Sequence, residues 1–277
     1  MKITTFLCLI SLFALAHPAP AAEPDTIRKA PGEPTDGIIT HKITSPYQAG
    51  PTEARVLLPD DFKPSEKHRV VYVLPVEAGR EAKYGDGLLE IKKLGLHNKH
   101  RAIFVAPTFS ALPWYADHPT DAKLRQESYF LQVVVPFIDK AYPHDGRYLL
   151  GFSKSGWGAW SLLLRHPGLF ERAAAWDAPL LKAKPDQFGM GPIFGTQENF
   201  EQYQLTKLIE KQKNLLTEKR RLILTGYDNF RTHHEGMHAL LDELKIKHEY
   251  RDGPKVKHIW ESGWLSEAVE LLLADNN

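Results

Sequence analysis

The sequence predicts an α/β fold in which helices cover both faces of a mostly parallel central sheet. Short apolar runs alternate along the chain with segments that have apolar residues at helical spacing, the pattern typical of this class. Two of these runs, RVVYVL at residues 69–74 and RAIFVA at 101–106, are almost wholly apolar and stop at a proline, as expected of strands buried on both faces. A chain of 277 residues accommodates one such domain, which we place at residues 38–277.

Eight segments have the length and composition of strands, and four have the apolar spacing of helices. The expected strands are residues 38–43, 54–58, 69–74, 101–106, 147–150, 172–176, 222–225 and 248–251. The expected helices are residues 121–140, 155–165, 232–244 and 264–274. In the first helix Pro136 lacks a backbone donor, so we expect a kink there. Between residues 178 and 202 Gly and Pro interrupt any periodicity, which predicts a lid or a site loop.

The N-terminus has the features of a cleavable signal peptide. Lys2 precedes an apolar run at residues 6–16, and APA at residues 19–21 is an A-x-A cleavage motif. We therefore expect residues 1–22 to be removed and the protein to be secreted or periplasmic. Residues 23–37 are rich in Pro, Gly and charge and are expected to form a flexible leader.

Composition argues against several classes of partner. The chain has 35 basic and 34 acidic residues without a basic block, so neither nucleic acid nor an anionic membrane is an expected partner. No segment after the signal peptide offers about 20 apolar residues, so no membrane association is expected once the signal is cleaved. Cys8 is the only cysteine, and the mature chain would therefore contain no disulfide.

The strongest chemical signal lies in residues 148–159, YLLGFSKSGWGA. An expected strand runs there through Gly-x-Ser and further small residues into an expected helix, which is the context of a nucleophile elbow. Small neighbours are needed because the strand and helix backbones approach closely at such a turn. Ser153 is therefore the candidate nucleophile, and Ser155 occupies the position where a glycine is usual.

A serine hydroxyl needs a histidine as base, and the histidine needs an acid that orients it. His258 follows the last expected strand and is the candidate base. For the acid we favour Asp228, which follows the strand at 222–225, and Asp177 at the end of the strand at 172–176 is the alternative. All three lie after carboxyl ends of strands, where an α/β sheet gathers functional side chains.

An acyl-transfer intermediate also needs two N–H donors for its oxyanion. One is expected from Lys154, the residue after the nucleophile. The other is expected from the loop after residue 74, where Pro75 has no N–H and leaves Val76 or, by preference, Glu77. A further hypothesis is that the Glu77 and Lys154 side chains meet at the rim of the site and neutralise each other.

Residues 234–238, HEGMH, match the H-E-x-x-H pattern of zinc proteases. Gly236 weakens the helix that such a site requires, and no third ligand stands out downstream. A zinc hydrolase using His234 and His238 is therefore the least favoured alternative, and neither a metal nor an organic cofactor is expected.

Several of these motifs resemble the esterase D branch of the α/β-hydrolases, which includes S-formylglutathione hydrolases, feruloyl and acetyl-xylan esterases and mycolyltransferases. GFSKSGWGAWSLLLRHPGLF is similar to the elbow and following helix of that branch, and His258-Ile259-Trp260 is similar to its His-x-Trp. WYAD at residues 114–117 resembles its Trp-Tyr-x-Asp stretch. LPVEAG takes the place of its His-Gly loop but departs from it at residues 75–76.

The resemblance implies an α/β-hydrolase fold and an exported serine esterase that forms an acyl-enzyme from a small-molecule or carbohydrate ester. Trp114, Tyr115 and Trp157 are the residues expected to bind the substrate. Two other functions remain open: an acyltransferase with the same residues, and a non-catalytic binding module with the same fold.

Overall fold

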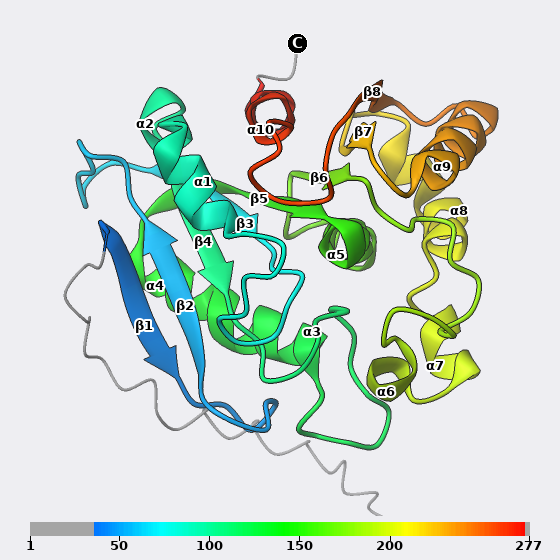
Figure 1. Ribbon diagram of the computed structural model, residues 1–277, viewed down its shortest axis with the longest axis horizontal. Helices are drawn as coiled ribbons and strands as arrows, with labels where there is room; N and C mark the ends of the chain where they lie inside the picture. The colour runs from blue at the N-terminus through cyan, green and yellow to red at the C-terminus, as the bar shows by residue number, and fades with distance from the viewer. Residues whose placement is uncertain (1–35, 275–277) are drawn as a thin grey trace, which may run out of the picture.

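The computed structural model describes residues 36–274 and is built around one eight-stranded sheet (Figure 1). The strand order is β1-β2-β4-β3-β5-β6-β7-β8; β2 is antiparallel to both of its neighbours, and every other pairing is parallel. The strands are β1 (Ile38–Ile43), β2 (Thr52–Leu57), β3 (His68–Val73), β4 (Ile103–Pro107), β5 (His144–Phe152), β6 (Arg172–Trp176), β7 (Leu222–Tyr227) and β8 (His248–Lys255). The predicted α/β-hydrolase fold with a mostly parallel sheet is confirmed.

Successive residues of the central strands face opposite layers. In β3, Val70 and Tyr72 pack into one core while Val71 and Val73 pack into the other. The first core is covered by α4 (Val135–Ala141), α5 (Ser153–Arg165), α8 (Leu205–Leu216) and α9 (Arg231–Glu243). The second is covered by α1 (Gly87–Lys93), α2 (Leu96–Lys99) and α10 (Leu265–Leu273). Burial on both faces explains why the central strands are almost wholly apolar.

The helix expected at 121–140 is shorter and interrupted. It begins as α3 (Gln126–Tyr129), widens into the π-helical turn η1 (Phe130–Val134) and continues as α4, with Pro136 in its first turn. Pro136 cannot donate a backbone hydrogen bond, and the wider turn before it lets the helix continue without that bond. The kink expected at Pro136 thus takes the form of a π-bulge.

Several helices were not expected from the sequence. Besides α1 and α2, they are α6 (Gly191–Phe194), α7 (Gln197–Glu201) and α8. Helix α8 buries Leu205, Leu208 and Ile209, an i, i+3, i+4 pattern that would have indicated it. Helices α6 and α7 are single turns in the segment 178–202, too short to have a detectable period.

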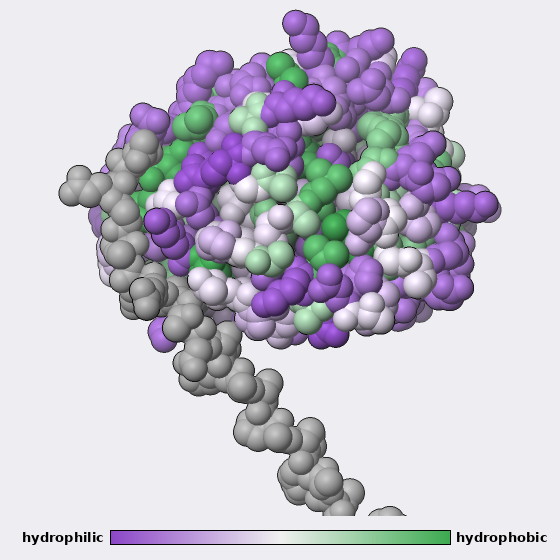
Figure 2. All heavy atoms as spheres, turned by 60° about the horizontal axis from the view of Figure 1, so that its bottom comes forward, coloured by the Kyte–Doolittle hydropathy of each residue, from purple (hydrophilic) through white to green (hydrophobic). Residues whose placement is uncertain are grey.

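The predicted signal peptide and residues 23–35 of the predicted leader lie outside the described residues. Between residues 36 and 274 no helix has the length and apolar character needed to cross a membrane. Figure 2 shows one face of the molecule, on which apolar surface forms narrow strips between hydrophilic regions. Within the described residues, the large hydrophobic side chains that are clearly exposed are Leu89, Leu94, Phe188 and Leu215.

Candidate active site

Ser153 lies at the sharp turn that joins the central strand β5 to α5, and its φ of +52° is in the left-handed region. A Cβ added to Gly151 would lie 2.4 Å from the backbone of Ser155, so the strand and helix approach too closely for any other residue. The hydroxyl of Ser155 accepts the Phe152 N–H at 3.1 Å and donates to the Phe152 carbonyl at 2.9 Å. Ser155 therefore closes the turn where a glycine is usual, and the turn holds Ser153 in a strained conformation.

The partner of His258 is Asp177. The Nδ1 atom of His258 lies 2.6 Å from Oδ2 of Asp177, which is fully buried and follows directly after β6. Asp177, the alternative acid of the sequence prediction, therefore holds the position beside His258, and the favoured Asp228 does not. Asp228 lies one strand further, after β7, where its carboxylate faces the Asn229 side chain at 3.5 Å.

The loop after β7 supplies backbone donors to Asp177 instead of an acid. The Asp177 carboxylate accepts the N–H of Asn229 at 3.0 Å and the N–H of Phe230 at 2.7 Å. Burial raises the pKa of Asp177, but hydrogen bonds from His258 and from the backbone of Asn229, Asp228 and Phe230 outweigh it, and the net pKa is lowered. Asp177 is thus held ionised next to the imidazole, and Asp228 takes part only through its backbone.

Ser153 and His258 line the same cleft, which has a volume of about 530 Å³. Its other lining residues are Tyr84, Trp114, Lys154, Pro179, Phe188, Asn229 and Phe230. The His258 ring packs edge-to-face with the rings of Phe152 and Tyr84, with centroids 5.0 and 5.7 Å apart. An imidazole surrounded by aromatic rings has few routes to bulk water, which strengthens its hydrogen bond to Asp177.

Of the three expected substrate-binding residues, Trp114 alone lines the cleft. All three are fully buried members of one core, in which Tyr115 and Trp157 lie behind the cleft. Trp157 packs edge-on against Trp114, with centroids 5.6 Å apart, and the Tyr115 hydroxyl donates to the Pro75 carbonyl. Their expected contact with substrate is corrected accordingly: they position Trp114 and the Pro75 loop.

The two expected oxyanion donors differ in their placement. Lys154 is in the first turn of α5, where backbone N–H groups have no partner within the helix, and it lines the cleft. Glu77 lies in a smaller neighbouring cavity, and its carboxylate accepts the Tyr84 N–H at 3.1 Å. Its side chain is not hydrogen-bonded to Lys154 in the described structure, because the Lys154 ammonium donates to the Val76 carbonyl at 2.9 Å.

The H-E-x-x-H residues have structural partners. His234 is buried, and its Nε2 accepts the Ala178 N–H at 2.8 Å, beside the Asp177 loop. His238 instead faces His248, with its Nδ1 2.7 Å from Nε2 of that residue. The absence of a side chain at Gly236 lets the segment 178–202 pack closely against the helix, since an added Cβ would lie 2.6 Å from the Leu181 side chain. His234 and His238 therefore do not converge on one ion.

Five residues of the cleft were not named individually as site residues from the sequence. They are Tyr84, Pro179, Phe188, Asn229 and Phe230, and they come from three separate loops. Pro179 and Phe188 lie in the segment 178–202, so the expectation of a site loop there agrees with the cleft. Phe230 lies two residues after Asp228, so its loop was already expected at the site. No motif in the sequence pointed to Tyr84.

Strand order, the turn at Ser153 and the cleft at the carboxyl edge of the sheet define an α/β-hydrolase. Residues 91–257 match the model of the family described as "Putative esterase", and the chain belongs to this esterase family. No curated protein matches the sequence.

Solved structures with the same fold include three hydrolases. A ferulic acid esterase is 21% identical with a TM-score of 0.66, and the match covers 85% of this chain and 96% of that one. The fluorophosphonate-binding serine hydrolase F of Staphylococcus aureus is 14% identical with a TM-score of 0.70, and the match covers 86% of this chain and 98% of that one. An S-formylglutathione hydrolase from Agrobacterium tumefaciens is 13% identical with a TM-score of 0.65, and the match covers 91% of this chain and 98% of that one.

Proposed function

We propose that this esterase hydrolyses carboxylic esters through a Ser153–His258–Asp177 triad and an acyl-enzyme. The observation that carries the proposal is the 2.6 Å contact between His258 Nδ1 and the buried Asp177, on an imidazole that shares its cleft with Ser153. With Asp177 bonded to Nδ1, the opposite nitrogen of the ring is left to act on the serine hydroxyl.

The mechanism follows from these positions. His258 takes the proton of Ser153 as the hydroxyl attacks the ester carbonyl, and Asp177 stabilises the imidazolium that forms. The Lys154 N–H and a donor of the Val76–Glu77 loop stabilise the oxyanion. The imidazolium then protonates the leaving alcohol, and water activated by the same histidine releases the acid from Ser153.

The walls of the cleft favour an ester with an apolar or aromatic part. Trp114, Phe188 and Phe230 line it, and the Phe188 and Phe230 rings meet edge-to-face with centroids 5.7 Å apart. A ferulic acid esterase is among the proteins with this fold, which adds support for an acylated carbohydrate as substrate. The signal-peptide pattern at residues 1–22 supports export to the periplasm or the medium.

Labelling with a fluorophosphonate tests the nucleophile. Intact-mass measurement should show one adduct on the wild type and none on Ser153→Ala, which should also lose turnover of p-nitrophenyl acetate. The matched control is Ser161→Ala on the same helix, because the Ser161 hydroxyl is buried without a hydrogen-bond partner in the described structure. An adduct that persists in folded Ser153→Ala, or none on the wild type, would reject the proposed triad.

Lys154 is expected to position the oxyanion loop through its side chain. Burial lowers the pKa of the Lys154 ammonium, although Glu77 raises it, and the ammonium donates to the Val76 carbonyl. Lys154→Met keeps the volume but removes the donor, so kcat should fall about tenfold with little change in KM. Lys154→Arg should recover part of the loss; an equal effect of both variants on KM alone would instead indicate a role in substrate binding.

A further inference from the structure

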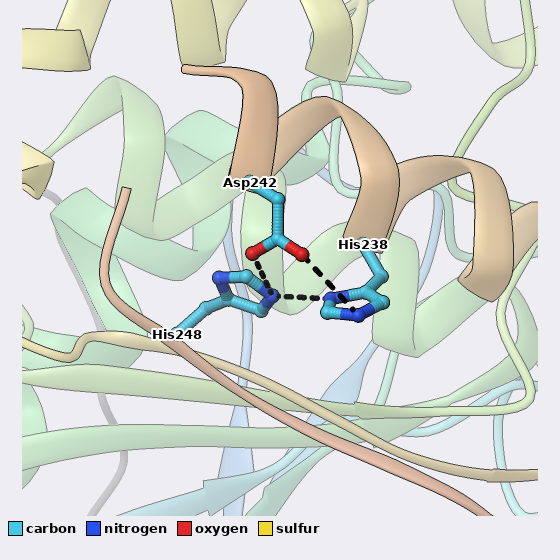
Figure 3. Close-up of side chains that lie close together, drawn as sticks. All are labelled: His238, Asp242 and His248. Carbon is cyan, nitrogen blue, oxygen red and sulfur yellow. Dashed lines mark hydrogen bonds and ion pairs between the residues drawn. The ribbon is translucent and has the colours of Figure 1, made fainter. Parts of the chain in front are cut away.

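We propose that His238, Asp242 and His248 form a binding site for a divalent transition metal such as zinc (Figure 3). One ligand atom from each residue lies within 4.8 Å of the other two. None of the three belongs to the lining of the catalytic cleft, so the site is separate from the proposed triad. Two imidazoles and one carboxylate form a ligand set suited to zinc.

A short turn brings these residues together. His238 and Asp242 are one helical turn apart on the last part of α9, and His248 is the first residue of β8. Lys245 ends the helix in the left-handed region, with a φ of +58°, and the Ile246 N–H donates back to the Leu241 carbonyl at 2.9 Å. The chain therefore reverses, and the start of β8 lies against the end of α9.

The spacing of the side chains is close to that of a metal site. His238 Nδ1 lies 2.7 Å from His248 Nε2, and Asp242 lies 3.5 Å from His238 Nε2 and 3.9 Å from His248 Nε2. Zinc ligands in tetrahedral geometry, at about 2.0 Å from the ion, are about 3.3 Å apart. The two contacts of His238 use different ring nitrogens, so His238 must turn one of them toward both His248 and Asp242 to place the three ligands around one ion.

The hydrogen bond behind His248 prepares it as a ligand. Its Nδ1 lies 2.8 Å from the Ile246 carbonyl, which can only accept, so Nδ1 carries the proton. The lone pair of Nε2 then points toward His238 and Asp242, as the dashed lines of Figure 3 indicate. A backbone carbonyl is one of the usual partners for the second ring nitrogen of a metal-binding histidine.

Charge and access also suit a cation. The nearby Lys247 donates to the Glu218 carbonyl at 3.3 Å, which draws its ammonium away from the ligands. The His248 side chain is only 6% exposed, whereas His238 is 34% and Asp242 is 63% exposed. The site thus has a fixed inner ligand and an open outer side, where water completes the coordination. A bound ion would join α9 to β8, the edge strand of the sheet.

The test is zinc titration of the full-length protein after treatment with a chelator. We expect one equivalent of zinc to bind, with a rise in Tm of about 5 °C at a hundredfold excess over Kd. His238→Gln and Asp242→Asn should each weaken binding at least tenfold, which reduces the rise in Tm at the same zinc concentration to about half or less. Cobalt should give the visible absorption of a tetrahedral site in the wild type and lose it in both variants.

Two controls separate this site from the rest of the molecule. Glu243→Gln removes an exposed carboxylate on the same helix but outside the cluster and should bind zinc as the wild type does. Ser153→Ala should also bind normally, which keeps this test independent of the proposed esterase chemistry. No saturable binding by the wild type, or unchanged affinity in both ligand variants, would overturn the proposal.

Discussion

Replacing Asp177 with Asn is expected to lower kcat/KM for p-nitrophenyl acetate by about 10³-fold or more, whereas Asp228→Asn should change it less than about threefold. Asp177 contacts His258 Nδ1 at 2.6 Å, and the amide would no longer stabilise the imidazolium in the transition state. Asp228 reaches the site only through its backbone N–H, which the substitution retains.

Asp177 is fully buried and accepts several N–H groups, so folding must be measured beside activity. Circular dichroism and Tm of both variants serve this purpose, and fluorophosphonate labelling of folded Asp177→Asn should slow in parallel with turnover. If Asp228→Asn were the inactive variant while Asp177→Asn kept its rate, the acid would be the residue that the sequence favoured.

The second large effect concerns stability in acid. Burial lowers the pKa of His234 to about 4; Asp177 opposes this shift and His233 adds to it. In the unfolded chain the pKa of a histidine is about 6.5. Between pH 4 and pH 6.5 His234 is therefore protonated in the unfolded state but neutral in the folded state. The stabilisation is therefore complete above about pH 6.5 and decreases as the pH falls toward 4. At pH 4.5 the loss from this group should be about 2.5 kcal/mol.

The measurement is urea unfolding at pH 7.5 and pH 4.5 for the wild type and His234→Gln. Glutamine retains an acceptor for the Ala178 N–H but cannot take up a proton. The wild type should lose about 2.5 kcal/mol more than the variant, and the contribution of Asp177, whose lowered pKa acts in the same direction, cancels in the difference. Equal losses in the two proteins would show that His234 is not the titrating group.

Local patterns were enough to predict most of the sheet and the turn at Ser153. The strands at 38–43 and 172–176 have the bounds of β1 and β6, because a fully apolar or alternating run is determined by its own residues. Gly151 and Ser153 were identifiable because a tight strand-to-helix turn restricts residue type within a few positions. The single-turn helices α6 and α7, which lie within the segment 178–202, were missed because they are too short to have a detectable period.

The sequence by itself determined the class of fold, the nucleophile turn and the set of candidate partners for Ser153. It favoured Asp228 over Asp177 as the acid, although both follow strands that end at the same edge of the sheet. Tertiary structure places Asp177 rather than Asp228 next to His258: β6 lies next to β5, and the turn after β7 directs backbone N–H groups rather than a carboxylate at Asp177. The same dependence on packing separated Trp114, which reaches the cleft, from Tyr115 and Trp157 behind it. Which side chains share a site depends on distances between strands and loops, and those distances are properties of the packed sheet.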